Sequence, residues 1–74
     1  MNLATCARRV SVRIVAVEVG DQVGLRLREL GLRPGALVEV THDGRSHGRV
    51  VAVGADRFAL DRRTCSGIRV EAAG

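Results

Sequence analysis

Residues 25–40 read Leu25-Arg-Leu-Arg-Glu-Leu-Gly-Leu-Arg-Pro-Gly35-Ala-Leu-Val-Glu-Val40. Val23, Leu27 and Leu30 are spaced so that all three share one face of a helix. The charged residues take the other side: Arg26, Arg28 and Glu29. The stretch therefore predicts a short amphipathic helix, which we expect Asp21 to cap at its N-terminus.

The residues that follow predict where this helix ends. Gly31 suits the left-handed position just after a helix, and Leu32 stands where a Schellman cap packs an apolar side chain back. Pro34 and Gly35 fit the two central positions of a type II turn, because Pro sets φ and Gly accepts a positive φ. Residues 36–41 then predict a strand.

Alternation of apolar and polar residues predicts the other strands. Residues 10–14 alternate with period two, and the apolar run at 15–17 predicts a bulge or a sharp bend. Asp43-Gly44 is the strongest turn signal in a hairpin loop expected over residues 42–48. Further strands are expected at residues 49–53, 57–61 and 67–71, with one helical turn at 62–66. The residues expected to face inward are Val38, Val40, Val51, Val53, Phe58, Leu60, Ile68 and Val70.

Together these elements predict an all-β fold, a small closed barrel of about five strands with one short helix inserted after the first strand. Residues 1–7 predict a helical turn or a loose lead-in, with Asn2 or Thr5 as its cap. Because no repeat, linker or low-complexity block interrupts the chain, we expect residues 1–74 to form a single domain.

Composition limits the function that the chain can perform. It has 74 residues with one Phe and neither Tyr nor Trp, so its core is small and aliphatic and leaves little room for a deep catalytic cleft. The carboxylates are scattered and no nucleophile motif or phosphate loop is present. We therefore expect no enzyme activity and no cofactor.

The charge and hydropathy pattern indicates location and partner chemistry. The net charge is +4 and every cationic side chain is Arg, spread along the chain. A positive net charge suits binding to nucleic acid, anionic lipid or an acidic protein. The alternative is that the arginines only solvate the strand faces and loops. Without an apolar span or a signal-peptide segment, the chain is expected to be cytoplasmic and not inserted in a membrane, with Cys6 and Cys65 reduced.

Two alternative functions remain open at this point. His42, Asp43 and His47 are weak candidates for a metal site in the hairpin loop, against the alternative of solvated loop histidines. A barrel rich in arginine also suits nucleic acid, but base stacking usually needs aromatic platforms and Phe58 is the only aromatic residue. We therefore expect neither a dedicated metal site nor a nucleic-acid partner.

The stronger candidate is a protein-binding surface at the end of the predicted helix. It would consist of Arg26, Arg28, Leu32 and Arg33, since arginine and exposed apolar groups are enriched at interfaces. The alternative is that Leu32 serves only the helix cap, while the arginines complement the dipole at the helix C-terminus.

Four segments closely resemble the FeoA family of small proteins of bacterial ferrous iron transport. They are Leu27-Arg-Glu-Leu-Gly-Leu-Arg-Pro-Gly35, Val38-Glu-Val40, Phe58-Ala-Leu60 and Ile68-Arg-Val70. The resemblance implies an SH3-like β-barrel and signature residues at Leu30, Gly31, Leu32, Pro34 and Gly35. The chain departs from the family pattern in two places. Residues 3–9 lack the Gly that family members often have in this segment, and residues 46–48 also differ from the usual pattern.

The resemblance also implies the function. The chain would be a non-catalytic accessory protein that docks on the cytoplasmic GTP-binding domain of the FeoB iron permease. A similar module forms the C-terminal domain of iron- and manganese-dependent repressors, so a metal-sensing or regulatory barrel is one alternative and a small nucleic-acid-binding barrel is another. The oligomeric state stays open.

Overall fold

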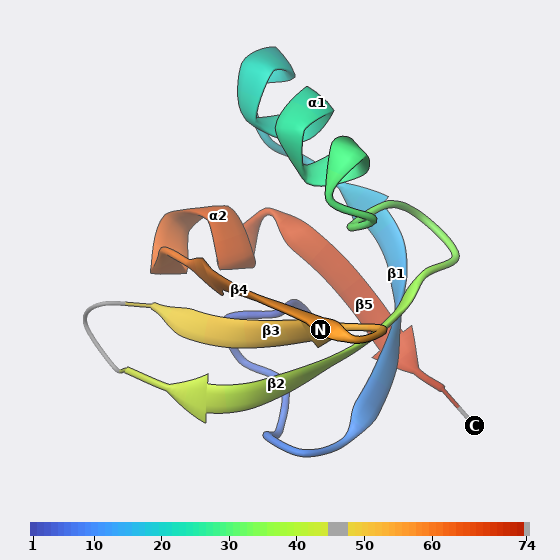
Figure 1. Ribbon diagram of the computed structural model, residues 1–74, viewed down its shortest axis with the longest axis vertical. Coiled ribbons are helices and arrows are strands. Elements are labelled where there is room, and N and C mark those ends of the chain that lie inside the picture. Colours follow the sequence, from blue (N-terminus) through green and yellow to red (C-terminus); the bar gives the residue numbers. More distant parts are fainter. Residues whose placement is uncertain (45–47, 74) are drawn as a thin grey trace.

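Five strands and two helices are arranged along the described residues, 1–44 and 48–73, of the computed structural model (Figure 1). They are β1 (Ser11–Val17), α1 (Asp21–Glu29), β2 (Leu37–Asp43), β3 (Arg49–Val53), β4 (Asp56–Leu60), α2 (Arg62–Ser66) and β5 (Ile68–Ala72). The mostly β architecture and the single helix after the first strand confirm the predicted fold class.

The strands form one antiparallel sheet in the order β4-β3-β2-β1-β5. The sheet curls, and α2 joins its edge strands β4 and β5 (Figure 1). No ladder pairs these two strands within the described residues, so the barrel is partly open rather than fully closed. The register of β1 shifts between Ile14 and Ala16, which confirms the predicted bulge.

A second register shift, in β2, changes the boundary of the predicted hairpin loop. The shift lies between Val40 and His42, and pairing with β3 continues beyond it to Asp43 and Arg49. His42 and Asp43 therefore belong to the strand, although the sequence placed them in a loop. The bulge lets pairing continue after the alternation of side chains has been interrupted.

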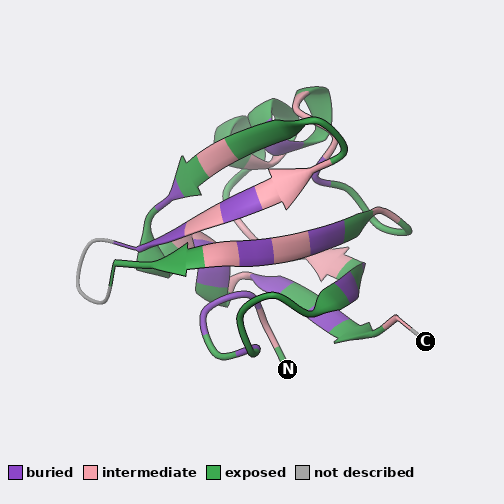
Figure 2. Cartoon of the chain, turned by 60° about the horizontal axis from the view of Figure 1, so that its bottom comes forward, coloured by how far each residue is buried: buried purple, intermediate pink, exposed green. Residues whose placement is uncertain are grey.

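Alternate residues of the strands form the core (Figure 2). The inward residues of β2 and β3 are nearly inaccessible, and those of β1 and β5 complete the same cluster. Val53 and Phe58, which were expected inside, are half-buried at its margin. The strand residues of the core are Val12, Ile14, Val38, Val40, Val51, Leu60, Ile68 and Val70.

The predicted helix stop and turn are confirmed by their hydrogen bonds. The Leu32 N–H donates to the Leu27 carbonyl at 2.8 Å and the Gly31 N–H donates to the Arg28 carbonyl at 3.0 Å, which is the Schellman pair. Gly31 has φ +93°. Gly35 has φ +94°, and the bond from the Ala36 N–H to the Arg33 carbonyl closes the next turn at 3.0 Å.

The start and the packing of α1 differ from the prediction. Gly20 is the N-cap, and Asp21 lies in the first turn without a capping bond, where its charge still favours the helix dipole. Within α1, all of which is described, only Leu27 is buried, while Val23 is 43% exposed. The helix therefore projects from the barrel (Figure 1).

The N-terminal segment, residues 1–7, is an integral part of the core. It makes the predicted helical turn, with the Asn2 side chain accepting from the Ala4 N–H at 2.8 Å. It is not a loose lead-in, because Leu3, Ala4 and Cys6 are buried. The Leu3 N–H also donates to the Ile68 carbonyl, which fastens the segment along β5.

Candidate functional site

The helix-end patch is the set of three arginines, Arg26, Arg28 and Arg33, at the C-terminus of α1. Arg26 and Arg28 lie in the last helical turn, and Arg33 follows the Schellman cap. All three are exposed, and none has an ion pair or side-chain hydrogen bond to another described residue. The patch therefore presents guanidinium donors that an incoming carboxylate could accept from.

Leu32 is not part of this surface, which corrects the predicted contact set. Its side chain is 1% exposed and belongs to the core. The Schellman cap is the reason, because it turns the chain back so that the apolar side chain after Gly31 packs inward. The sequence allowed two roles for Leu32, contact with a partner or packing at the helix cap, and the structure shows packing at the helix cap.

Leu25 supplies the exposed apolar group that Leu32 does not. It is 59% exposed and stands two residues before buried Leu27, so the two side chains point to opposite sides of α1. The sequence carried this signal, since Leu25 is an apolar residue on the charged side of an amphipathic helix. Leu25 therefore stands beside the helix-end patch, whereas Val23 lies on the same side of α1 as Leu27.

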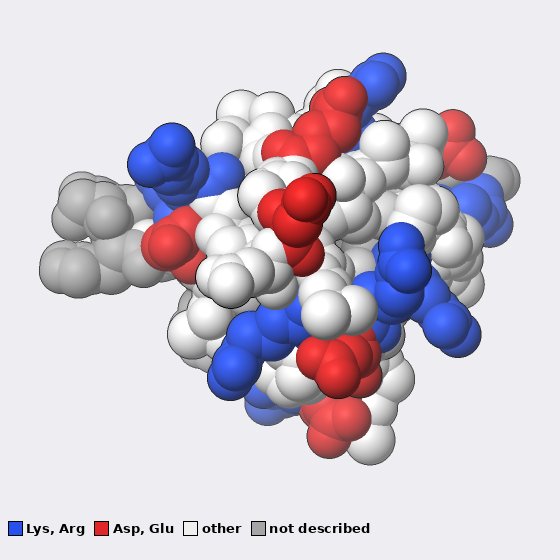
Figure 3. Space-filling view, turned by 90° about the horizontal axis from the view of Figure 1, so that it is seen from above, with Lys and Arg blue, Asp and Glu red and all other residues white. Residues whose placement is uncertain are grey.

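A groove lies between α1, β4 and α2. Its volume is about 290 Å³, and apolar side chains of α1 form one wall, facing β4. A second hollow of about 530 Å³ adjoins it and shares Val23, Asp61 and Thr64 with it. Figure 3 shows that acidic and basic side chains are interspersed over the face on which α1 lies, so the positive charge of the helix-end patch is local.

The predicted metal candidates are not assembled into a ligand set by the described residues. The Asp43 carboxylate pairs with Arg49 at 3.2 Å and with Arg62 at 3.5 Å. His42 is exposed on β2, with its Nδ1 3.4 Å from the Thr41 hydroxyl, and His47 lies outside the described residues. The described part of the chain holds no group of three or more His, Cys, Asp or Glu side chains suited to a metal.

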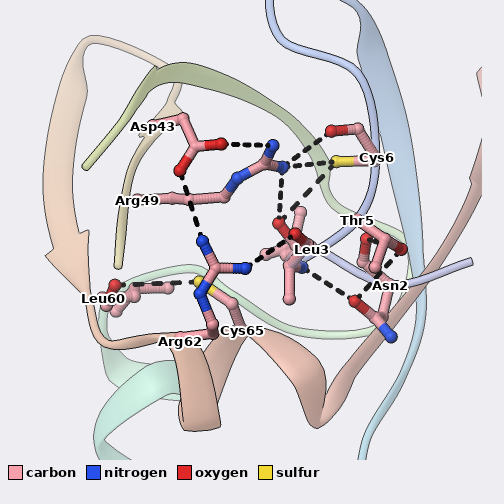
Figure 4. Close-up of polar contacts among 10 residues, drawn as sticks. Asn2, Leu3, Thr5, Cys6, Asp43, Arg49, Leu60, Arg62 and Cys65 are labelled. Atoms are coloured by element: carbon pink, nitrogen blue, oxygen red, sulfur yellow. Dashed lines mark hydrogen bonds and ion pairs between the residues drawn. The ribbon is translucent and has the colours of Figure 1, made fainter. Parts of the chain in front are cut away.

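Arg49 is the centre of a buried polar network (Figure 4). Its guanidinium donates to the Leu3 carbonyl at 2.9 Å, to the Cys6 carbonyl at 2.7 Å and to Asp43. Arg62 joins the network by donating to Asp43 and, at 3.5 Å, to the Ala4 carbonyl. This network was not predicted from the sequence, although period-two alternation places Arg49 on the same inward side as Val51.

Both thiols are free and buried next to this network. Burial raises the pKa of Cys6 and that of Cys65, and the positive charge of Arg49 offsets part of each rise. The thiolate is the reactive form of cysteine, so neither residue is suited to act as a nucleophile at neutral pH.

Among the residues that the structure describes, neither helix has the length and hydropathy of a membrane-spanning segment.

Comparison with known proteins gives consistent results. A sequence model of the FeoA domain matches residues 1–72. No curated protein matches the chain significantly in sequence. The FeoA of Stenotrophomonas maltophilia in its zinc complex, described as a prokaryotic SH3 domain protein, is 29% identical with a TM-score of 0.83. That match covers 96% of this chain and 89% of the other.

Two further solved structures share the fold. Iron(II) transport protein A of Clostridium thermocellum is 27% identical with a TM-score of 0.85, and the match covers 97% of this chain but 45% of that one. The FeoA protein of Chlorobium tepidum has a TM-score of 0.92 at 23% identity, with 100% and 71% of the two chains covered. These likenesses confirm that the partly open barrel is SH3-like.

Proposed function

The chain belongs to the FeoA family, which is associated with ferrous iron transport, and from that premise we propose that it docks on the cytoplasmic GTP-binding domain of the FeoB permease. The family is one of accessory transport proteins and not of known enzymes. In this proposal the chain contributes binding energy alone, and the permease carries out transport.

The observation that carries the docking proposal is the exposure of α1. The helix buries one side chain, Leu27, and presents Leu25 and the helix-end patch to solvent. Arginine is enriched at interfaces and in binding hot spots, and an exposed leucine adds the apolar area that the core of an interface contains. An acidic and partly apolar surface on the GTP-binding domain would complement it.

Docking affects the permease only if the chain binds two of its conformations with different affinities. A ligand can shift a conformational equilibrium by no more than that difference. A tenfold preference for one conformation corresponds to about 1.4 kcal/mol. Such a preference is within reach of one hot-spot side chain together with a few charge-assisted hydrogen bonds.

Leu25→Asp tests this proposal with a matched control. The variant places a carboxylate in the α1 surface, and Val10→Asp introduces the same carboxylate at another exposed apolar residue, 49% accessible and away from α1. Leu32→Asp is unsuitable because it would put a charge into the core. Binding of the purified GTP-binding domain of FeoB from the same host would be measured by isothermal titration calorimetry.

The proposal expects wild type and Val10→Asp to bind alike. Leu25→Asp should weaken binding by about tenfold or more, which corresponds to a loss of about 1.4 kcal/mol or more. Absence of binding by wild type would refute docking on this domain. Equal binding by all three proteins would place the contact elsewhere on the barrel.

A further inference from the structure

The two edges of the sheet are not equivalent. The outer edge of β5 is covered by the N-terminal segment, because the Leu3 N–H donates to the Ile68 carbonyl and the Val70 N–H donates to the Met1 carbonyl. The outer edge of β4 has no such cover, because its residues make no backbone hydrogen bond outside the β3 ladder to any described residue. β4 is therefore an edge strand beside which a further strand can pair.

The hairpin between β3 and β4 determines which residues of β4 direct their backbone groups outward. Its loop consists of residues 54–55, and Val53 pairs with Asp56 across it. The pair that flanks a two-residue loop is hydrogen-bonded, because the loop is a β-turn whose first carbonyl accepts from the fourth N–H. Hydrogen-bonded pairs alternate along an antiparallel ladder, and the register of this ladder is continuous. Arg57 and Ala59 therefore direct their N–H and C=O groups away from β3.

This open edge carries a charge pattern that is complementary to itself. Arg57 and Ala59 are exposed, and so is Asp61, which continues the extended backbone of β4 with φ −69° and ψ 163°. These three side chains share one face of the strand, because they alternate with half-buried Phe58 and buried Leu60. A cation thus stands two residues before Ala59, and an anion stands two residues after it.

A second copy of the chain is the occupant that matches this pattern. When β4 pairs antiparallel with its own copy about a two-fold axis at Ala59, Arg57 stands opposite Asp61 of the other copy, and the pair recurs across the axis. Phe58 then stands opposite Leu60 on the other face. Arg57 has no ion pair or side-chain hydrogen bond to another described residue. Asp61 caps α2 through its Oδ1 atom, which leaves its Oδ2 atom for Arg57.

We propose that the chain forms a two-fold dimer in which the β4 edges of two copies pair and join their sheets. The Ala59 N–H and C=O groups of the two copies bind each other at the axis, and the Arg57 and Asp61 side chains pair on either side of it. Opposite charges directly across an antiparallel pair stabilise it, and like charges destabilise it. The net charge of +4 opposes association, so the dimer depends on this local match. The inference concerns the chain alone and does not rest on docking.

Charge reversal at the two positions tests the dimer. Arg57→Glu places a carboxylate opposite Asp61, and Asp61→Arg places a guanidinium opposite Arg57, so each variant alone should self-associate about tenfold more weakly or worse. An equimolar mixture of the two variants should recover the association of wild type, because the mixed dimer restores both charge pairs. Sedimentation equilibrium over a range of concentrations measures each sample. Asp61→Arg also removes the cap of α2, so thermal unfolding would first establish that this variant is folded.

Two variants serve as matched controls. Arg8→Glu makes the same change as Arg57→Glu at an exposed residue outside β4, and should associate at least as well as wild type. Asp56→Arg makes the same change as Asp61→Arg on the same strand, but in this register it stands opposite no residue of β4. Mixing Asp56→Arg with Arg57→Glu should therefore not recover association, although the sum of charges is the same as in the first mixture.

Amide hydrogen exchange followed by NMR locates the contact in the wild-type chain. The Ala59 amide should exchange fast in dilute solution because it lacks a partner. Its exchange should slow by about tenfold or more as the protein concentration rises, as that of a newly hydrogen-bonded amide does. The amides of β1 serve as the internal reference, because this strand is already paired on both sides.

The remaining outcomes would overturn the dimer. They include a wild-type chain that stays monomeric at the concentrations used for NMR, and a mixture of the two reversed variants that does not recover association. A dimer in which the exchange of Ala59 is unchanged would place the contact away from β4. Protection of Ala59 only on addition of the GTP-binding domain of FeoB would show that the permease, and not a second copy, takes this edge.

Discussion

Arg49 is a single buried residue that links three segments of the chain. Its side chain is 8% exposed, and a buried charge is costly unless its donors are matched. Three of its contacts lie within 3.2 Å, to Leu3, Cys6 and Asp43, while its Nε has no hydrogen-bond partner among the described residues. The guanidinium therefore joins β3 to both the N-terminal segment and β2.

Replacing Arg49 by Met should cost about 3 kcal/mol of unfolding free energy, since it leaves the buried Leu3 and Cys6 carbonyls without the guanidinium that donates to them. Arg69→Met is the control, because Arg69 also faces a carboxylate, Glu18 at 3.9 Å, but both side chains are more than half exposed. Such a surface pair contributes about 0–1 kcal/mol. Urea unfolding measures both values, and similar losses would show that the buried network is not stabilising.

Leu25 and Leu32 give a second comparison of residue environments. Leu32→Ala removes a core side chain and should cost about 2–5 kcal/mol. Leu25→Ala acts at an exposed position and should change stability by no more than about 0.5 kcal/mol. Thermal and urea unfolding of the two variants would test this order, and a large loss for Leu25→Ala would mean that the Leu25 side chain is packed rather than exposed in solution.

The two helices differ in the hydrogen bonds that cap their ends. α1 lacks a side-chain cap at Gly20 but ends in the Schellman pair, whereas α2 is capped at its N-terminus by Asp61, which accepts from the Thr64 N–H at 2.6 Å. Because α1 has no side-chain cap at Gly20 and has Gly24 in its interior, substitutions at either place could raise its stability. The cap of α2 makes the stability of that helix sensitive to the charge of one carboxylate.

The same substitution at two glycines of this region should have opposite effects. Gly24→Ala lies inside α1, where the new Cβ would stand 3.5 Å from Val19, an ordinary contact, so it should stabilise the protein by about 0.5–1 kcal/mol. Gly31→Ala must adopt φ +93° and should destabilise it by about 1–2 kcal/mol. Chemical denaturation of both proteins provides the measurement, and a loss at Gly24 would contradict the helical assignment of that position.

The cap of α2 predicts a dependence on pH. The hydrogen bonds from Thr64 lower the pKa of Asp61 below its ordinary value. Because the folded-state pKa lies below the unfolded one, the contribution of Asp61 is complete above about pH 4 and is lost as the pH falls through the lowered pKa. Asp61→Asn keeps a cap acceptor without this titration.

The difference in melting temperature between wild type and Asp61→Asn should therefore be constant from about pH 7 to pH 5 and should shrink in more acidic solution. Circular dichroism melts at a series of pH values supply the measurement. A difference that stays constant through the acidic range would show that the charge of Asp61 does not contribute to stability.

At the scale of the whole molecule, the N-terminal segment covers one edge of the partly open barrel, that of β5. It buries Leu3 and Cys6, covers the edge of β5 and supplies three carbonyls to Arg49 and Arg62. The same arrangement leaves β4 as the uncovered edge. The molecule is therefore closed on one side of its sheet and open on the side where α1 projects (Figure 1).

Removing residues 1–7 should lower the melting temperature by about 10 °C or more, because the burial of Leu3 alone is worth about 1.5–3 kcal/mol and each kcal/mol shifts a domain of this size by about 4–8 °C. The Cys65 thiol, fully buried in the intact chain, should then react faster with a thiol reagent. Thr5→Ala, at an exposed position of the same segment, is the control. An unchanged melting temperature would mean that the segment only lies on a core that is complete without it.

Short-range features were determined by the sequence itself. The end of α1, the turn at Pro34 and Gly35, and the inward side of β2 and β3 depend on residues within a few positions of one another. Their backbone demands are met locally, so spacing and residue type were enough to predict them. The resemblance of these same segments to FeoA also identified the family correctly.

Only the tertiary structure decided which side chains are free. Arg49 and Leu3 are 46 positions apart, and Arg62 reaches Ala4 across 58, so no local pattern could predict that Asp43 pairs with Arg49 and Arg62. Exposure of Leu25 and burial of Leu32 likewise depend on how α1 sits on the barrel. Such contacts follow from the order of strands in the sheet, because that order brings distant segments together and leaves the edge of β4 open.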